Sequence, residues 1–459
     1  MIKLGMGGRE TMQELTAGKS KDIYRRLLII ISLTIYILVL MNNYRVTYTP
    51  GEAGGNYPTF VFMLSFFLAL LPSLWLPASI SRPSQLMYWV LYLLIVVPAS
   101  TIPIYVLSME PERLILLPVS LVAAFALFGL IYTVPAIRLP HIKTGSLLFW
   151  VLVGGIILVL FFMVINSFGL PKGLPGLSAI YDVRSEYSES LKGMPGHISL
   201  AVRWLLYIFN PLLIAYGLTK RRIFLLGLGL LGQLYIYSVS GFKSALFFIF
   251  MVLGFLLAMK MKPGSFGLLI TNGLNLLVIG SIIISYLFNN DKPWHIFVRR
   301  LLFVTGTNTG YYYDYFTSHP FVFMSSNRLL GYLVDYVKPY ELSIPFLIGQ
   351  EYRGRLFSAN ANFWADAFAN YGFFGLFIYT VALMLLMYLY DSLCEGKNIY
   401  LCSLLLSGPT FALCNSSLFT AFMGHGGFWV FVIAFLLPKN KLDCPDQGWS
   451  PDEFSKEGP

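Results

Sequence analysis

A chain of 459 residues with 57% hydrophobic and only 12% charged side chains is not a soluble globular protein, because soluble domains carry about 25% charged residues. The mean hydropathy of +0.69 and the repeated apolar runs predict an all-α polytopic integral membrane protein. The net charge of +10 does not indicate a nucleic-acid partner, because basic residues at cytoplasmic helix ends orient membrane proteins. The four cysteines form no CxxC pair, so neither a disulfide framework nor a metal site is expected.

The N-terminal residues 1–26 are polar and basic and are expected to form a cytoplasmic segment without a cleavable signal peptide. A transmembrane region, 27–437, follows, in which apolar runs predict about twelve spans. These runs are 27–42, 58–77, 86–107, 114–133, 146–167, 198–218, 223–239, 244–260, 266–288, 372–390, 399–414 and 418–437. The tail 438–459, rich in Pro, Asp, Glu, Ser and Lys, is expected to be disordered and cytoplasmic.

The distribution of Lys and Arg predicts the orientation of the chain. With the N-terminus inside, most basic residues of the short loops are cytoplasmic, and only Arg45, Arg113 and Lys243 lie in short outer loops. Both termini are therefore expected in the cytoplasm. Two long loops, 168–197 and 289–371, are expected outside and to carry short amphipathic helices, one of them over 325–338.

The first long loop contains a compact group of charged and phenolic side chains around Tyr181, Asp182, Arg184 and Glu186. The planar fork of Arg184 suits a phosphate or diphosphate. The alternative is an ion pair between Arg184 and either carboxylate on a solvated loop. Arg203, inside the next apolar run, favours an anionic site at this end, because a membrane arginine needs a partner or a water-filled cavity. Its alternative is snorkelling to the headgroups.

Three further basic residues accompany this group. Lys243 lies in the polar turn 238–244, which is either a ligand contact or a simple hairpin. Arg299 and Arg300 open the second long loop and can neutralise a lipid diphosphate or contact ordinary headgroups. The aromatic run 311–316, with Tyr313 at its centre, can stack on sugars, but an interfacial aromatic belt uses the same residues.

A polar stripe precedes the tenth apolar run. If this segment is helical, Asn362, Asp366 and Asn370 fall on one face at i, i+4 and i+8. With Asn360 they supply hydrogen-bond donors and a carboxylate that can act as a general base. The alternative is a capped, solvated helix start that leads directly into the tenth span.

The segment 350–355 adds Arg353 and Arg355, and His425 lies among glycines in the outer part of the last run, where a membrane histidine is a functional candidate. No HExxH, DxD, P-loop or GxSxG pattern is present. We therefore expect no metal and no cofactor. The absence of DxD argues against a nucleotide-sugar glycosyltransferase that depends on a metal, and the absence of a P-loop argues against an ATP-driven transporter.

Over roughly 180–375 the order of these segments is similar to that of a known family. The order is Tyr181-Asp182-Val183-Arg184, Arg203-Trp204 with Asn210-Pro211, Ser240-Gly241-Phe242-Lys243-Ser244, Arg299-Arg300, Tyr312-Tyr313-Asp314-Tyr315-Phe316, Ser358-Ala359-Asn360-Ala361-Asn362, Asp366 and Tyr371-Gly372-Phe373-Phe374-Gly375. In this order and in its expected topology the chain resembles the bacterial O-antigen polymerases, the Wzy-type oligosaccharide repeat-unit polymerases.

The resemblance implies a glycosyltransferase of the bacterial inner membrane, with an active site facing the periplasm. Its donor and acceptor would be glycans on undecaprenyl diphosphate, with membrane lipids and a chain-length regulator as further partners. Asp366 would be the first choice of base, followed by Glu186 and His425. The diphosphate would be bound by some of Arg184, Arg203, Lys243, Arg299, Arg300, Arg353 and Arg355. The sugars would be held by Tyr313, Asn360 and Asn362.

Three alternatives stay open at this point. An O-antigen ligase has a similar membrane architecture but transfers the glycan to the lipid A core. A lipid-linked oligosaccharide flippase would carry its charges along a central cavity and would have short loops. A structural membrane component would not need clustered arginines.

Overall fold

The computed structural model describes residues 7–43, 57–139, 145–171, 173–176, 179–261, 264–327, 331 and 336–439. Every regular element in these ranges is a helix. Nine helices of the described chain are long and apolar enough to cross a membrane, so the protein is multi-pass by helix length and hydropathy. They are Asp22–Asn42, Ser84–Val106, Pro111–Thr133, Ser146–Phe168, Gly196–Thr219, Ile223–Ser240, Lys243–Met261, Phe266–Phe288 and Phe363–Leu393.

Prolines divide the helices of the first part of the chain. Pro98 and Pro103 have no N–H to donate, and the stretch that contains them alternates between α- and π-helical turns. The elements are α1 (Gly7–Asn42), α3 (Thr59–Leu70), η1 (Leu71–Leu74), α4 (Ser84–Leu91), η2 (Tyr92–Val96), α5 (Val97–Thr101), α6 (Pro103–Val106), α7 (Pro111–Gly129), η3 (Leu130–Thr133), α8 (Ser146–Phe168) and α9 (Ile180–Lys192).

A π-helical turn also precedes Pro211 in the second part of the chain. The Gln233 amide donates to the Leu206 carbonyl in that turn at 3.0 Å, which satisfies an acceptor inside the bundle. The elements are α10 (Gly196–Trp204), η4 (Leu205–Phe209), α11 (Asn210–Thr219), α12 (Ile223–Ser240), α13 (Lys243–Met261), α14 (Phe266–Phe288), η5 (Trp294–Phe303), α15 (Val304–Ser318), α16 (Ile344–Arg353), α17 (Phe363–Leu393), α18 (Ile399–Leu405), α19 (Ser407–Leu413), η7 (Thr420–Gly424) and α20 (Trp429–Leu436).

Nine of the twelve predicted spans correspond to the nine long helices. The runs 58–77 and 399–414 form shorter apolar helices, Thr59–Leu74 and Ile399–Leu413. The run 418–437 is divided into η7 and α20, because Gly426 adopts a φ of 82° between them. The amphipathic helix predicted over 325–338 lies largely outside the described residues, as does the predicted tail from residue 440 onward.

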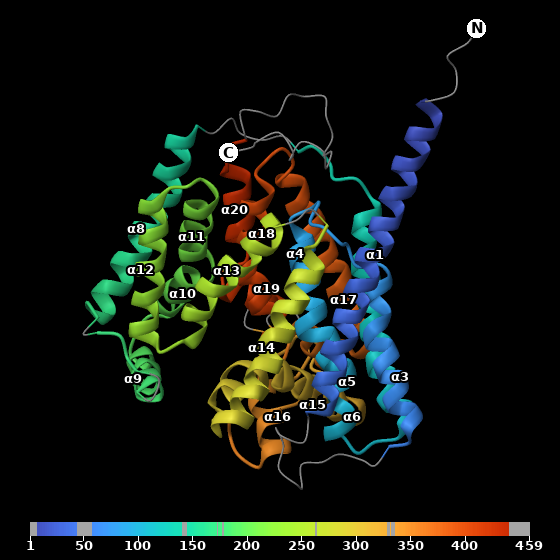
Figure 1. The fold of residues 1–459 in the computed structure, drawn as a ribbon. Coiled ribbons are helices and arrows are strands. Elements are labelled where there is room, and N and C mark those ends of the chain that lie inside the picture. The colour runs from blue at the N-terminus through green and yellow to red at the C-terminus, as the bar shows by residue number, and fades with distance from the viewer. Residues whose placement is uncertain are drawn as a thin grey trace.

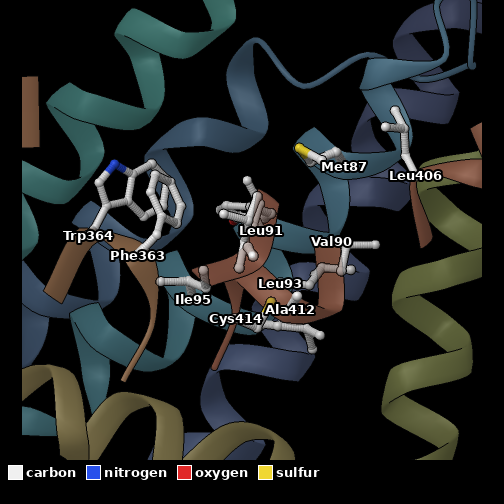
Figure 2. Close-up of a cluster of buried hydrophobic side chains, with 14 of the residues drawn as sticks. Met87, Val90, Leu91, Leu93, Ile95, Phe363, Trp364, Leu406, Ala412 and Cys414 are labelled. Atoms are coloured by element: carbon white, nitrogen blue, oxygen red, sulfur yellow. The ribbon is translucent and has the colours of Figure 1, made fainter. Parts of the chain in front are cut away.

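Close packing of small residues joins the helices, as expected where lipid removes the hydrophobic drive for association. α11 lies against α12 so closely that a Cβ added at Gly217 would be 2.6 Å from the Leu226 nitrogen. Figure 2 shows another part of the core, where Leu91, Ile95, Phe363 and Ala412 bring α4, η2, α17 and α19 into one buried cluster. α17 also packs on α7 and α15.

The two ends of the bundle differ in what they carry. α9, α15 and α16 lie toward one end of the bundle, which we call the α9–α16 end. The start of α1 lies toward the other end (Figure 1). The second long loop of the prediction is therefore a packed layer of helices. α15 contacts α5, α6 and α17, and its Tyr311–Phe316 run is mostly buried.

α17 is a hairpin of two helical arms. Its backbone leaves the helical region at Tyr371 (φ −146°, ψ 17°) and Gly372 (φ 61°, ψ −143°). Two contacts show that the chain reverses there. The Trp364 indole donates to the Thr380 hydroxyl at 2.9 Å, and a Cβ at Gly375 would collide with the Ala367 carbonyl. The expectation that the polar stripe leads directly into the tenth span is therefore wrong: the stripe lies on a short arm folded back against the span.

Candidate functional site

Five basic side chains from four different elements are linked through shared neighbours, and we call them the cation cluster. Arg300 lies within electrostatic range of Arg184 and Arg299, Arg184 and Arg203 both lie within range of Tyr207, and Lys243 lies over the Tyr181 ring. Arg184 comes from α9, Arg203 from α10, Lys243 from the start of α13, and Arg299 and Arg300 from η5. Segments more than a hundred residues apart in the sequence therefore contribute positive charge to one region.

The turn between α12 and α13 holds α9 in place. Gly241 ends α12 at a φ of 63°, and a Cβ there would lie 2.9 Å from the Ile180 carbonyl and 3.2 Å from the Arg184 nitrogen. Only glycine combines this backbone with so close an approach. The next residue, Phe242, packs its ring 5.4 Å from that of Tyr187 and lies 5.7 Å below the Arg184 guanidinium.

Aromatic faces, not carboxylates, support Arg184 and Lys243. The Lys243 ammonium lies 4.8 Å from the centre of the Tyr181 ring, an arrangement worth roughly 0.5–1 kcal/mol at exposed sites. The ion pairs found within the described residues are Arg25–Asp22 and Lys192–Glu189. The alternative of a pair between Arg184 and Asp182 or Glu186 is therefore not formed, and Glu186 is exposed on α9.

Positive charges lie close enough together to affect one another. Part of the Arg300 side chain is exposed, yet desolvation of its guanidinium and the positive charges of Arg184 and Arg299 lower the pKa of Arg300. The Arg299 Nε is buried and has no hydrogen-bond partner within the described structure. An anion with several negative charges would reduce the repulsion between these guanidinium groups and would accept hydrogen bonds from their N–H groups.

His425 lies within electrostatic range of Arg203. Arg203 donates to the Ser199 carbonyl at 3.1 Å and to its hydroxyl at 2.7 Å, and its charge reaches both His425 and Tyr207. The His425 ring packs edge-on against Tyr207, with 4.6 Å between ring centres. Its Nδ1 lies 3.0 Å from the Thr420 carbonyl. A carbonyl only accepts, so Nδ1 carries a proton and Nε2 is the acceptor of the neutral ring.

Asp366 lies in a separate place. It is on the short arm of α17, where its neighbours are Asn370 at 3.4 Å and the hydroxyl of Tyr379 on the long arm. Tyr312 of α15 is also within electrostatic range. Members of the cation cluster are not among the groups that act on this carboxylate. The structure thus brings His425, and not Asp366, to the arginines.

Asn362 has a structural position. It is fully buried, accepts from the backbone nitrogens of Trp364 and Ala365, and donates to the Thr309 hydroxyl at 2.7 Å. These contacts are those of the helix-cap alternative. Asn360 is exposed, and its side-chain oxygen accepts from the Ser358 hydroxyl at 2.9 Å.

The remaining predicted residues lie around α15 and α16. Tyr313 is 2% exposed and donates to the Arg113 carbonyl at 2.7 Å, so it packs in the core and does not face a ligand. Arg353 lies over the Tyr311 ring at 5.5 Å and Arg355 over Phe357 at the same distance. Neither of these arginines belongs to the cation cluster.

Some residues that shape these sites have weak sequence signals. Tyr207 reads as an ordinary residue of an apolar run and Phe242 as part of a polar turn, yet they support His425 and Arg184, respectively. The pair of Tyr352 and Asp314, joined by a 2.6 Å hydrogen bond beneath α16, was also not singled out. No three His, Cys, Asp or Glu side chains come together in the part of the chain that the structure describes.

Comparison of the chain with protein-family models, with curated proteins and with solved structures finds no match. The functional argument therefore depends on the residues and their arrangement.

Proposed function

We propose that the protein is a bacterial inner-membrane glycosyltransferase that polymerises oligosaccharide repeat units carried on undecaprenyl diphosphate. The observation that carries this proposal is the cation cluster. It joins four elements at one end of a multi-pass bundle, and its members Arg184, Lys243 and Arg300 have no carboxylate partner within the described structure. A diphosphate at the membrane surface carries the negative charge that such a cluster would bind.

The chemistry follows from the leaving group. An acceptor hydroxyl on a lipid-linked repeat unit attacks the anomeric carbon of the donor glycan, and the bond from that carbon to the diphosphate oxygen breaks. Undecaprenyl diphosphate leaves with the bonding electrons, and the cluster stabilises its growing negative charge. The hydroxyl proton passes to a base.

His425 is the base that the geometry favours. Its Nε2 is the accepting nitrogen, its ring is held by Tyr207 and Thr420, and it lies beside Arg203. Asp366 would have to act at a distance from the arginines, and Glu186 is exposed on α9. The α9–α16 end would face the periplasm, as the basic residues of the opposite loops favour. A chain-length regulator stays a predicted partner.

Deletion of the protein tests the proposal against its alternatives. Loss of a polymerase leaves lipopolysaccharide with core plus a single repeat unit on a gel. Loss of a ligase or a flippase leaves bare core, and that result would overturn the proposal. An unchanged ladder would show that the protein takes no part in this pathway.

A further inference from the structure

An apolar cleft of about 520 Å³ lies between α8 and α10. Its volume is in the range typical of ligand sites. α8 packs directly on α10, and it lies at the margin of the bundle in Figure 1. The lining residues are Val151, Leu152, Gly155, Ile156, Val159, Leu160, Met163, His197, Leu200 and Trp204.

The cleft opens toward the lipid. The lining residues Val151 and Val159 are 60% and 58% exposed, which is the state of a surface that hydrocarbon covers in a membrane. Gly155 lies in its wall, and a Cβ added there would meet nothing within 4 Å. From Val151 to Met163 the α8 wall extends for about 18 Å at 1.5 Å per residue, so it can hold the first several units of an isoprenyl chain.

One end of the cleft adjoins the cation cluster. Trp204, which lines the cleft, directly follows Arg203, and His197 lies at the start of the same helix. At the end of α8, the Phe168 ring packs 5.4 Å from Tyr187 of α9, the helix that carries Arg184. The helices that form the cleft therefore also carry Arg203 and contact the helix of Arg184. An apolar surface for a lipid tail and cations for a diphosphate headgroup are therefore provided by neighbouring elements.

We propose that this cleft binds the polyisoprenyl tail of a lipid diphosphate whose headgroup occupies the cation cluster at Arg203 and Arg184. The identity of the lipid rests on the proposed function. The cleft gives the substrate a lateral route from the membrane, because its long side is open and no helix has to move for the tail to enter.

Two neighbouring glycines give a matched test. Gly155→Trp fills the cleft, whereas Gly154→Trp adds the same side chain to the same helix at a position that does not line it, and both sites have free space for a Cβ. The purified full chain in detergent is titrated with undecaprenyl diphosphate and with inorganic diphosphate. We expect Gly155→Trp to weaken undecaprenyl diphosphate binding by about tenfold or more, Gly154→Trp to leave it unchanged, and neither to alter inorganic diphosphate binding.

Equal binding of undecaprenyl diphosphate by both variants would overturn the assignment. So would displacement of that lipid by phosphatidylglycerol at equal concentration, which would make the cleft an ordinary phospholipid contact. If Gly155→Trp does not fold, photocrosslinking of the unaltered protein with a benzophenone-bearing isoprenyl diphosphate replaces it. Crosslinks within 151–163 or at the α10 lining residues support the cleft, and crosslinks confined to elements other than α8 and α10 reject it.

The binding assay tests the cleft assignment and the gel tests the polymerase proposal, so each can be contradicted without the other. If deletion leaves bare core while Gly155→Trp still loses the lipid, the polymerase proposal is wrong and the cleft assignment stands. If deletion leaves a single repeat unit while Gly155→Trp binds normally, the polymerase proposal stands and the cleft assignment is wrong.

Discussion

The Trp364 indole donates a 2.9 Å hydrogen bond to the hydroxyl of Thr380, sixteen residues further along the chain. In a continuous helix these two side chains would be about 24 Å apart along the axis. Their contact shows that α17 turns back on itself, and it places Asp366 between the two arms, beside Tyr379. The hairpin is thus a unit of packing, whereas the cation cluster is the part of the structure that fits an anionic ligand.

Gly372 is expected to be necessary for the hairpin. Its φ of 61° with ψ of −143° is a region that residues with a side chain avoid, and a Cβ would lie 2.8 Å from the Phe321 ring. Gly372→Ala should lower the free energy of unfolding by about 1–3 kcal/mol, measured as a lower thermal midpoint in detergent. Gly273→Ala in α14, where a Cβ meets nothing within 4 Å, is the control. Equal midpoints for both variants would contradict the hairpin.

Gly241 is expected to control the docking of α9. Gly241→Val combines an unfavourable φ with a collision against Ile180 and Arg184, so α9 should leave the α12–α13 turn. Limited proteolysis should then cut within 180–192, and binding of inorganic diphosphate should weaken. Gly193→Ala, at the end of α9 with open space around its Cβ, should retain the parent digestion pattern. Protection of α9 in Gly241→Val would argue against this role.

Arg184 is expected to contribute to anion binding through its charge. Arg184→Gln should weaken inorganic diphosphate binding about three- to tenfold, since a charge-assisted contact is worth roughly 1 kcal/mol or more, and the loss should shrink at high salt. Lys192→Gln removes a positive charge from the same helix at a position paired with Glu189 and is the matched control. An equal loss in both variants would indicate only a general effect of net charge.

His425 and Asp366 are expected to behave differently. His425→Ala should abolish polymerisation, seen as a single repeat unit on the gel, while diphosphate binding persists, because the ring is proposed as a base and not as an anchor. Asp366→Asn keeps the shape of the side chain between the arms of α17 and should retain a ladder. A ladder from His425→Ala together with its loss in Asp366→Asn would return the base to Asp366.

Asn362 is expected to act as a helix cap. Asn362→Ala removes the acceptor for the Trp364 and Ala365 nitrogens and the donor to Thr309, which should cost about 1–2 kcal/mol of stability. Asn360→Ala, at an exposed position nearby, should change the midpoint little. If instead Asn362→Ala keeps its stability and loses activity, a ligand contact would replace the capping role.

Apolar run lengths predicted the nine long helices, because a membrane span is determined by the local composition of the chain. The sequence also singled out each of the five basic residues of the cation cluster, but it did not predict α9 or separate these five from Arg353 and Arg355. The reversal at Gly372 could not be predicted, since a glycine between a polar stripe and an apolar run fits a continuous helix as well as a turn, and the break depends on the backbone dihedrals of Tyr371 and Gly372. The burial of Tyr313 was equally hidden, because an aromatic run looks the same whether it lines a site or fills a layer of helices.

η5 and α15 follow one another without a loop, from Trp294 to Ser318. One end of this 294–318 rod carries Arg299 and Arg300, and further along it Asn308 donates to the Asn360 carbonyl and Thr309 accepts from Asn362. A displacement of the two arginines must therefore either shift the anchorage of the α17 hairpin or bend the rod where its π-helical turns end at Phe303. The 294–318 rod therefore couples the cation cluster mechanically to the α17 hairpin, although the cluster is not among the groups that act on Asp366.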